Sequence, residues 1–350
     1  MKELGPVQYA TTVDGLSIAY VAMRRGMPLV YLPGQFSSLQ HLREDLNDGP
    51  WTEMLAARYR LVRYDGRGQG MSTRGMTEAQ TIETLGYDLD AVVDKLGLTR
   101  FVVFARWYAA HIAIRYAVAH PERVAALILD GCAEDNSRWP ESVYLDLPDQ
   151  NWEVFMLSQM PKEVSFDQAR RRMAQIDDAV QPADLARRAR AYRASNVTKE
   201  LPRVKVPTLV LHPRNYLMVA AAESMNVAAR IPGARFSFID GEMLPGDAVT
   251  GLKAIDDFLR ELELPEDAFE PPSLPLSGGT NVATAGLSPR QRQVLQLIAL
   301  GKTNREIAGE LVLSERTVQR HIADLYLKID VRNRAEAVGY ARDHALRERT

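Results

Sequence analysis

Five polar side chains lie close together near the end of the chain, where their chemistry suits contact with nucleic acid. The apolar Val318, Ile322 and Leu325 recur at helical spacing, so they are expected to face a core. The outward positions near the start of this helix are then Arg316, Thr317, Gln319, Arg320 and His321. Arg can pair with a guanine edge through two hydrogen bonds, and Gln can do the same with an adenine edge.

Local signals around these residues predict four short helices. Ser288, Thr303 and Asn333 are N-cap residues, each followed three positions later by Gln or Glu, and Ser314 caps the remaining helix. Apolar residues at helical spacing should share one small core, and they are Val294, Leu295, Ile298, Ile307, Leu311, Val318, Ile322, Leu325, Val338 and Ala341. Residues 287–350 are therefore predicted to form a small all-α, four-helix domain.

The charge of the chain is distributed unevenly. Residues 287–350 hold 12 Lys and Arg against 8 Asp and Glu, whereas the preceding residues hold 31 against 37. A small basic domain attached to a larger acidic one is the pattern expected when only the smaller one binds DNA.

A linker is predicted between the two parts. The stretch 265–286 contains four prolines and three glycines, and it shows neither a helical nor an alternating apolar period. We therefore expect a domain at residues 1–265, a linker at 266–286 and a second domain at 287–350.

In residues 1–265, short apolar runs alternate with helical stretches. The runs that predict strands are 28–32, 60–64, 101–104, 124–129, 208–211 and 236–239. This alternation predicts an α/β fold with a doubly wound, mostly parallel sheet. Two further runs, 7–12 and 16–23, are joined by Asp14-Gly15 and predict an antiparallel hairpin at one sheet edge.

Helical, charge-rich residues at about 134–201 interrupt the alternation between two strands. An insertion there covers the carboxyl ends of the parallel strands, where open α/β sheets bind their ligands. We therefore expect a helical cap. Its Arg170-Arg171-Arg172 run is expected to be a solvated helix face.

Two motifs make residues 1–265 resemble an α/β-hydrolase with a helical cap. The turn after the run 60–64 reads Asp65-Gly66-Arg67-Gly68-Gln69-Gly70-Met71-Ser72, similar to the Asp-x-Arg-Gly-x-Gly-x-Ser turn of that family. The segment 119–124 reads Ala-His-Pro-Glu-Arg-Val, similar to the family's entry into its sixth strand. Asp65, Arg67 and Ser72 are expected to order their own turn.

The resemblance implies a Ser–acid–His triad, but the expected positions hold other residues. The nucleophile elbow, Gly-x-Ser-x-Gly in the family, here reads Ala105-Arg106-Trp107-Tyr108-Ala109. Residues 100–129 contain no Ser, Cys or Asp that a shifted alignment could use. At the usual acid position the chain has Asn215 and Tyr216. Some members of the family place the acid one strand earlier, which here is near Asp130, Glu134 or Asp135.

The histidine is also missing. The loop after the run 236–239 holds Met243 or a neighbour where the base is expected, and no histidine occurs between Pro213 and Arg320. Acyl transfer through a triad needs an imidazole that titrates near neutrality. We therefore expect no catalytic residue and a domain that is not an enzyme.

The same pocket could still bind a small molecule. Main-chain N–H groups of Gln35 and Tyr108 would supply the family's oxyanion donors, and Trp107 and Tyr216 would add aromatic walls. The residues expected to bind an apolar effector that bears a carbonyl or carboxylate are Gln35, Phe36, Trp107, Tyr108, Trp139, Trp152, Met156, Tyr216 and Met243. Three alternatives remain: a packed scaffold without ligand, an unorthodox hydrolase or lyase with the C-terminal domain as autoregulator, and an interaction protein in which residues 1–265 only dimerise.

Residues 287–350 are similar to the LuxR-type helix-turn-helix domain. The similarity lies in Leu287-Ser288-Pro289-Arg290-Gln291, in residues 301–308 (Gly-Lys-Thr-Asn-Arg-Glu-Ile-Ala) and in residues 313–322. It implies that Thr317, Gln319 and Arg320 approach bases, that Thr303, Asn304, His321 and Lys328 hold phosphates, and that Arg316 lies beside them. It also implies a homodimer on double-stranded DNA.

The remaining sequence features concern the cellular location of the protein and its cofactors. The single Cys132 cannot form an intrachain disulfide, and the N-terminus lacks the apolar stretch of a signal peptide, so a cytoplasmic location is expected. No apolar run is long enough for a membrane span. We also expect no cofactor and no metal. The sequence therefore predicts a transcription regulator that responds to a small-molecule effector.

Overall fold

The computed structural model divides the chain into two compact units, Met1–Pro272 and Ser273–Thr350. The division falls within residues 266–286, the range predicted as a linker. The residues described are 5–23, 26–42, 45, 48–138, 151, 152, 154, 166–214, 216, 219–240 and 246–264 in the first unit, and 294, 295, 297, 298, 302, 304–311, 318, 322, 325, 326, 328, 329, 331, 336, 337 and 340 in the second.

An eight-stranded sheet lies at the centre of the first unit, in the order β1-β2-β4-β3-β5-β6-β7-β8. Its strands are Gln8–Thr11 (β1), Ser17–Met23 (β2), Pro28–Tyr31 (β3), Arg60–Tyr64 (β4), Phe101–Arg106 (β5), Val124–Asp130 (β6), Thr208–Pro213 (β7) and Arg235–Ile239 (β8). All pairs from β4 to β8 are parallel, whereas β2 pairs antiparallel with both β1 and β4. The predicted parallel sheet and its edge hairpin are confirmed.

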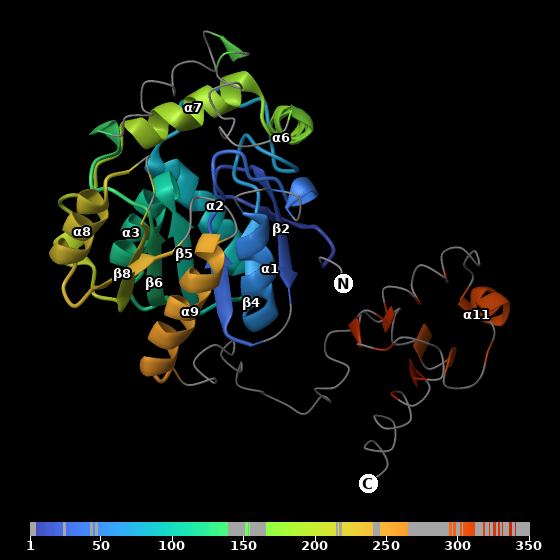
Figure 1. Ribbon diagram of the computed structural model, residues 1–350. Helices are drawn as coiled ribbons and strands as arrows, with labels where there is room; N and C mark the ends of the chain where they lie inside the picture. Colours follow the sequence, from blue (N-terminus) through green and yellow to red (C-terminus); the bar gives the residue numbers. More distant parts are fainter. Residues whose placement is uncertain are drawn as a thin grey trace. The chain divides into compact units, whose positions relative to one another are not determined.

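Helices cover both faces of the sheet (Figure 1). The helices α1 (Gly49–Arg58) and α9 (Gly246–Glu261) pack on one face, where Trp51, Leu55 and Ile255 share a core with the strands. The helices α2 (Ile82–Lys95), α3 (Ala110–Ala119) and α8 (Ala221–Arg230) pack on the other. Because both faces are covered, every residue of β6 is buried, as a central parallel strand requires.

The segment between β6 and β7 carries helices that lie over one end of the sheet (Figure 1). Its described part includes a 3-10 turn, Asn136–Arg138, and the helices α6 (Phe166–Ala179) and α7 (Pro182–Arg193). Several hydrogen bonds attach this segment to the loop after β4. The Gly70 N–H donates to the Ala179 carbonyl over 2.6 Å, and the Asp184 carboxylate accepts from the N–H groups of residues 75 and 76 over 2.6 and 2.7 Å.

The prediction for the arginine run of α6 is wrong at one position. Arg170 and Arg171 are exposed, but Arg172 is only 6% exposed and donates to the Asp45 carboxylate over 2.5 Å. Asp45 lies in the body, 127 positions earlier in the chain. Arg172 is therefore one of the residues that attach the cap to the body.

The second unit is built around the small core that the helical spacing predicted. Among its described residues, the buried side chains are Val294, Leu295, Ile298, Ile307, Ala308, Val318, Ile322, Leu325, Ile329 and Ala337. The helix α11 (Asn304–Leu311) starts one residue after the predicted N-cap, Thr303. Thr303 itself, Arg316, Thr317, Gln319, Arg320 and His321 lie outside the described residues.

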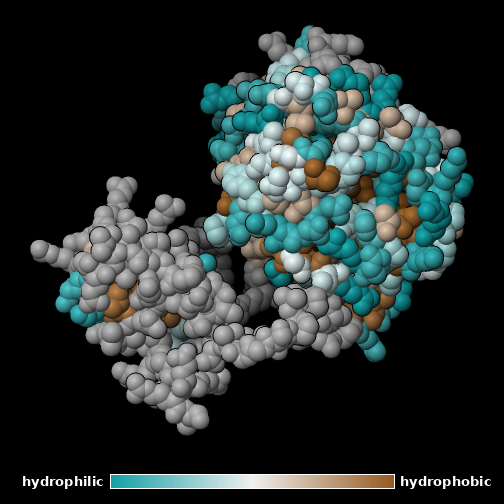
Figure 2. All heavy atoms as spheres, turned by 180° about the vertical axis from the view of Figure 1, so that it is seen from behind, coloured by the Kyte–Doolittle hydropathy of each residue, from teal (hydrophilic) through white to brown (hydrophobic). Residues whose placement is uncertain are grey.

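The surface of the first unit is mixed. Figure 2 shows one face of it, on which hydrophobic residues are scattered among hydrophilic ones. In the part of the chain that the structure describes, no helix is long and apolar enough to cross a membrane.

Candidate functional site

The turn between β5 and α3 has an unusual backbone. Trp107 adopts a φ of 54° and begins a 3-10 turn, Trp107–Ala109, before α3 starts. A bulky L-residue at positive φ is strained, by about 1–3 kcal/mol, and such strain persists only where the surroundings impose it. This strand-to-helix turn is the one in which α/β-hydrolases present their nucleophile, and here it presents an indole.

The indole of Trp107 lies against a second aromatic ring. It stacks on Tyr216, which follows β7, with ring centroids 6.4 Å apart and an interplanar angle of 17°. A Cβ added at Gly131, after β6, would lie 3.2 Å from Trp107 Cδ1 and 3.3 Å from Tyr216 Cε1. Gly131, with a φ of 60°, therefore allows both rings to approach the end of β6. The carboxyl ends of three neighbouring strands meet at this point.

A buried ion pair lies directly beneath the indole. The Arg106 guanidinium is 4.4 Å from the Trp107 ring centroid, and its Nε donates to Asp130 Oδ2 over 2.7 Å. The pair forms because residues 106 and 130 are register partners in the parallel strands β5 and β6. Burial raises the pKa of Asp130, and the charge of Arg106 lowers it again only in part.

A second buried pair extends this network. Asp48, before α1, accepts from Arg63 Nη2 over 2.8 Å and from the Tyr31 hydroxyl over 2.7 Å. Burial raises the pKa of Asp48, but Arg63 and Arg106 outweigh that effect, so the pKa is lowered. Arg63 also donates to Ser37 Oγ over 2.9 Å, which connects the network to the loop after β3.

The loop after β3 is held in place from both the body and the cap. Gln69 Nε2 donates to the carbonyls of Gly34 and Ser37 over 3.3 and 2.8 Å. Arg188, a buried residue of α7, donates to the Gln35 carbonyl. This loop carries the predicted main-chain donor of Gln35, so both sides of the site fix its backbone.

The predicted ligand-binding residues fall into two groups. Trp107, Tyr108 and Tyr216 belong to the main core, where Tyr108 stacks on Tyr192 of α7 with centroids 5.7 Å apart. Phe36 and Trp152 pack together against an apolar cluster of the cap that contains Ile176, Val180 and Leu185. Trp139, Met156 and Met243 lie outside the described residues.

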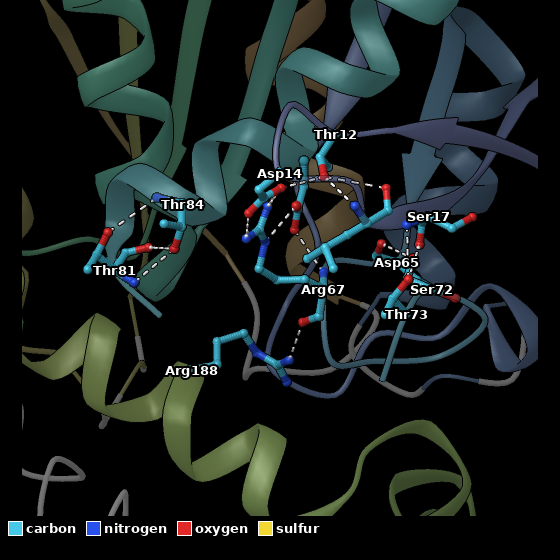
Figure 3. A network of polar contacts seen from close by, with 12 residues as sticks. Thr12, Asp14, Ser17, Asp65, Arg67, Ser72, Thr73, Thr81, Thr84 and Arg188 are labelled. Carbon is cyan, nitrogen blue, oxygen red and sulfur yellow. Dashed lines mark hydrogen bonds and ion pairs between the residues drawn. The ribbon is translucent and has the colours of Figure 1, made fainter. Parts of the chain in front are cut away.

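In the turn after β4, Asp65 and Ser72 order their own turn as predicted, through bonds to the Met71 N–H and the Asp65 carbonyl, but the prediction for Arg67 is wrong. Figure 3 shows Asp65, Arg67 and Ser72 in this turn. Asp65 accepts from the N–H groups of Leu39 and Met71, each over 2.8 Å, and burial raises its pKa to about 7. Arg67 reaches further and pairs with Asp14 of the hairpin and Asp88 of α2.

His111, one turn after Trp107, is part of the core. It is fully buried, with Nδ1 2.7 Å from Ser195 Oγ and Nε2 2.9 Å from the Ala133 carbonyl. The carbonyl can only accept, so Nε2 carries the proton and Nδ1 accepts from the hydroxyl. Burial lowers the pKa of His111 to about 4, despite the opposing effect of the carbonyl. Both ring nitrogens of His111 are therefore hydrogen-bonded to other residues of the same domain.

Sequence reasoning missed Arg106, which contacts the indole, and the buried charges Asp48 and Arg188 of the surrounding network. None of the three had a signal in the chain that distinguished it from a surface charge. Gly131 had one, since a glycine directly after a buried strand often marks close backbone approach. Among the described residues, no cluster of three His, Cys, Asp or Glu side chains could hold a metal ion.

In the second unit, two of the predicted DNA-binding residues are described. Asn304 is half-buried and begins α11, and Lys328 is exposed. Lys328 lies one turn after the core residue Leu325, on a helical segment. Its position fits a phosphate contact, which needs an accessible cation.

Comparison with known families matches both units. The family "alpha/beta hydrolase fold" matches residues 28–238, and "Bacterial regulatory proteins, luxR family" matches residues 285–341. The first match covers more than half of the chain and includes β3 through β8.

Individual proteins are similar to one or the other of the two units. The CsgBAC operon transcriptional regulatory protein of Escherichia coli is 41% identical over 64 residues, which cover 18% of this chain and 30% of that protein. The transcriptional regulatory protein LiaR of Bacillus subtilis is 42% identical over 69 residues, or 19% of this chain and 33% of that protein. The enol-lactonase of Burkholderia xenovorans shares the fold, with a TM-score of 0.61 and 21% identity over 72% of this chain and 100% of that one.

The chain therefore belongs to the α/β-hydrolase fold family, and a LuxR-type DNA-binding regulator domain is fused to the C-terminal side of its hydrolase-fold domain.

Proposed function

We propose that the hydrolase-fold domain is a non-catalytic sensor, which binds a small apolar organic molecule bearing a carbonyl or carboxylate and so controls the LuxR-type domain. The observation that carries this proposal is Trp107 at a φ of 54°. The strained turn of a nucleophile elbow is kept, yet the residue that it presents has an aromatic face and an N–H donor instead of a nucleophile.

Two buried donors support a ligand with an acceptor oxygen. Trp107 Nε1 and Gln35 Nε2 are both buried, and neither has a hydrogen-bond partner among the residues that the structure describes. A buried donor left unsatisfied costs about 1–3 kcal/mol. A carbonyl or carboxylate oxygen at the carboxyl ends of the paired strands β3 and β5 could accept from such donors, while the Trp107–Tyr216 stack would contact the apolar part.

The proposed regulation requires that the effector bind more tightly to one placement of the LuxR-type domain than to another. A ligand shifts an equilibrium only by the difference in its affinity for the two states. We propose that the effector favours one placement of the LuxR-type domain, and that a homodimer binds double-stranded DNA. The base-reading residues would be Thr317, Gln319 and Arg320.

Replacing Trp107 by Ala should weaken effector binding at least about tenfold, because the stacking surface and its N–H are lost together. Calorimetry on the full chain with a panel of apolar acids, esters and lactones measures this. Trp107→Phe is the matched variant, since it keeps an aromatic ring but loses the N–H and part of the stacking surface, so the affinity of this variant should fall between those of the wild type and Trp107→Ala.

Two outcomes would count against the sensor. If no compound of the panel binds, the domain acts as a scaffold. If the compounds are recovered hydrolysed or cleaved, the domain is an enzyme that uses unorthodox groups, and chromatography of the recovered ligand detects this directly.

In the LuxR-type domain, Lys328→Ala should weaken binding to specific and random DNA alike and reduce the salt slope by about one. Arg320→Ala should instead lower discrimination for the operator by about 1–3 kcal/mol. Titrations at several salt concentrations on both DNAs separate the two roles. Equal losses on both DNAs for Arg320→Ala would refute its role in base reading.

A further inference from the structure

One edge of the sheet in the hydrolase-fold domain is formed by β8. In the part of the chain that the structure describes, β8 is the last strand of the sheet and pairs with β7 on one side (Figure 1). The Arg214 N–H donates to the Ile239 carbonyl over 3.0 Å, so residue 239 directs its backbone groups toward β7. Successive residues of a strand direct these groups to opposite sides. The N–H and C=O groups of Phe236 and Phe238 therefore point to the open side of β8.

The same strand exposes an aromatic side chain. Phe238 is 37% exposed, and its ring lies against that of Phe236, with centroids 5.0 Å apart. Residues two apart in a strand share a face, so both rings lie on the face of the sheet that carries α8. The helices α8 and α9 both contact β8, and each exposes a large apolar side chain, Met225 and Val249. Exposed apolar groups therefore belong to β8 and to both helices that pack against it.

The edge lacks features that usually keep a strand from pairing with another molecule. Proteins protect such edges with lysine, proline, an inward-pointing charge or a bulge. Residues 235–239 contain neither lysine nor proline, and β8 follows β7 without a shift of register. The charges at its two ends are compensated within the domain, by the exposed pairs Arg235–Glu261 and Arg214–Asp240. These pairs carry no net charge, so those of two copies do not repel each other.

We propose that two copies of this chain pair through β8, antiparallel and about a two-fold axis at Ser237, so that their sheets become continuous. In this register Phe236 of each copy lies opposite Phe238 of the other. Each opposed pair exchanges two hydrogen bonds through its outward N–H and C=O groups, as alternate pairs of an antiparallel ladder do. The Phe238 carbonyl already accepts from the Ser237 hydroxyl over 3.3 Å, and its second lone pair serves the new bond.

The occupant is a second copy because β8 is complementary to itself. The residues with outward backbone groups, Phe236 and Phe238, lie symmetrically on either side of Ser237. Centring the axis on Ser237 overlaps all five residues of both strands and brings the four rings together on one face, where cross-strand aromatic pairs are favourable. This inference depends on β8 alone and requires neither an effector nor DNA.

A disulfide at the axis tests the register in the full chain. Ser237 faces Ser237 of the second copy in a pair without hydrogen bonds, whose Cα atoms are about 4.5 Å apart, within reach of a disulfide. Ser237→Cys should therefore form a covalent dimer in oxidised glutathione, measured by electrophoresis without reductant. The native thiol of Cys132 is buried.

Arg235→Cys is the matched control for the position of the thiol. Its side chain lies on the same face of the same strand and is 51% exposed, but its counterpart lies four residues away, about 13 Å along the ladder. Because a disulfide cannot span that distance, Ser237→Cys should cross-link at least about tenfold faster than Arg235→Cys.

A second pair of variants tests the aromatic residue in the Ser237→Cys background. Phe238→Glu places a carboxylate opposite an apolar ring and should slow cross-linking at least about tenfold. The Arg214 guanidinium, 4.9 Å from the Phe238 ring, can pair with the new carboxylate, so the domain should keep its fold and its melting temperature. Tyr9→Glu replaces an exposed aromatic residue of the opposite edge strand, β1, and should leave cross-linking unchanged.

The proposal is overturned if Ser237→Cys cross-links no faster than Arg235→Cys, if Phe238→Glu leaves its cross-linking unchanged, or if Tyr9→Glu slows it equally. Sedimentation equilibrium of the wild-type chain should show a reversible dimer, and a chain that stays monomeric at every concentration would also overturn the proposal. Because no effector is added, these outcomes are independent of the proposed sensor function.

Discussion

Replacing Arg106 by Met should lower the free energy of unfolding of the hydrolase-fold domain by about 3–5 kcal/mol at neutral pH. Arg106 is the ion-pair partner of Asp130, whose side chain is 0% exposed, and Asp130 Oδ1 has no hydrogen-bond partner among the described residues. Without the guanidinium, the carboxylate would be left charged in the core. Removing one member of a buried pair costs more than the pair itself contributes.

The size of this effect should depend on pH. Burial already raises the pKa of Asp130, and loss of Arg106 would raise it further. At low pH the folded variant can keep Asp130 protonated, so the penalty is partly avoided, whereas at higher pH the carboxylate is charged and the full penalty applies. The destabilisation should therefore grow as the pH rises.

Urea unfolding followed by tryptophan fluorescence measures this in the intact chain. All four tryptophans, at positions 51, 107, 139 and 152, lie in the hydrolase-fold domain, so the signal reports on that domain alone. The double variant Arg106→Met/Asp130→Asn is the control, and it should recover part of the lost stability because no charge is left unpaired. A penalty that is small and independent of pH would show that the ion pair does not matter for folding.

Acidification should destabilise the hydrolase-fold domain through His111 by up to about 3 kcal/mol. Burial lowers the pKa of His111 from 6.5 to about 4, so the folded state holds the neutral ring. The unfolded chain takes up the proton once the pH falls below about 6.5. The stabilisation is therefore complete above that value, and it is lost progressively as the pH falls to about 4.

His111→Gln isolates this contribution. Asp65 and Asp88 titrate with the opposite sign, because burial raises their pKa values to about 7 and about 6, so the wild-type profile is a sum of several groups. The difference in unfolding free energy between wild type and His111→Gln should fall between about pH 6.5 and 4. His120→Gln, at a ring that is 39% exposed, is the control for replacing a histidine outside the core. A difference that stays constant over this range would rule out the assignment to His111.

The architecture was largely predictable from the chain. Strand spacing, the Asp14-Gly15 turn and the insertion after β6 depend on local residue patterns, which is why the sheet, its hairpin and the position of the cap helices agreed with expectation. Strand ends were less well predicted. β5 runs to Arg106 instead of Phe104, because the buried pair with Asp130 lets a charged residue continue a central strand.

The sequence by itself determined which residues stand at the elbow, that no histidine lies between Pro213 and Arg320, and that residues 287–350 carry a net positive charge. Only the tertiary structure decided what surrounds Trp107. Tyr216, Gly131 and the Arg106–Asp130 pair meet there because parallel strands bring their carboxyl ends to one edge of the sheet in a fixed register. These contacts join residues far apart in the chain, and no local pattern of residue types encodes them.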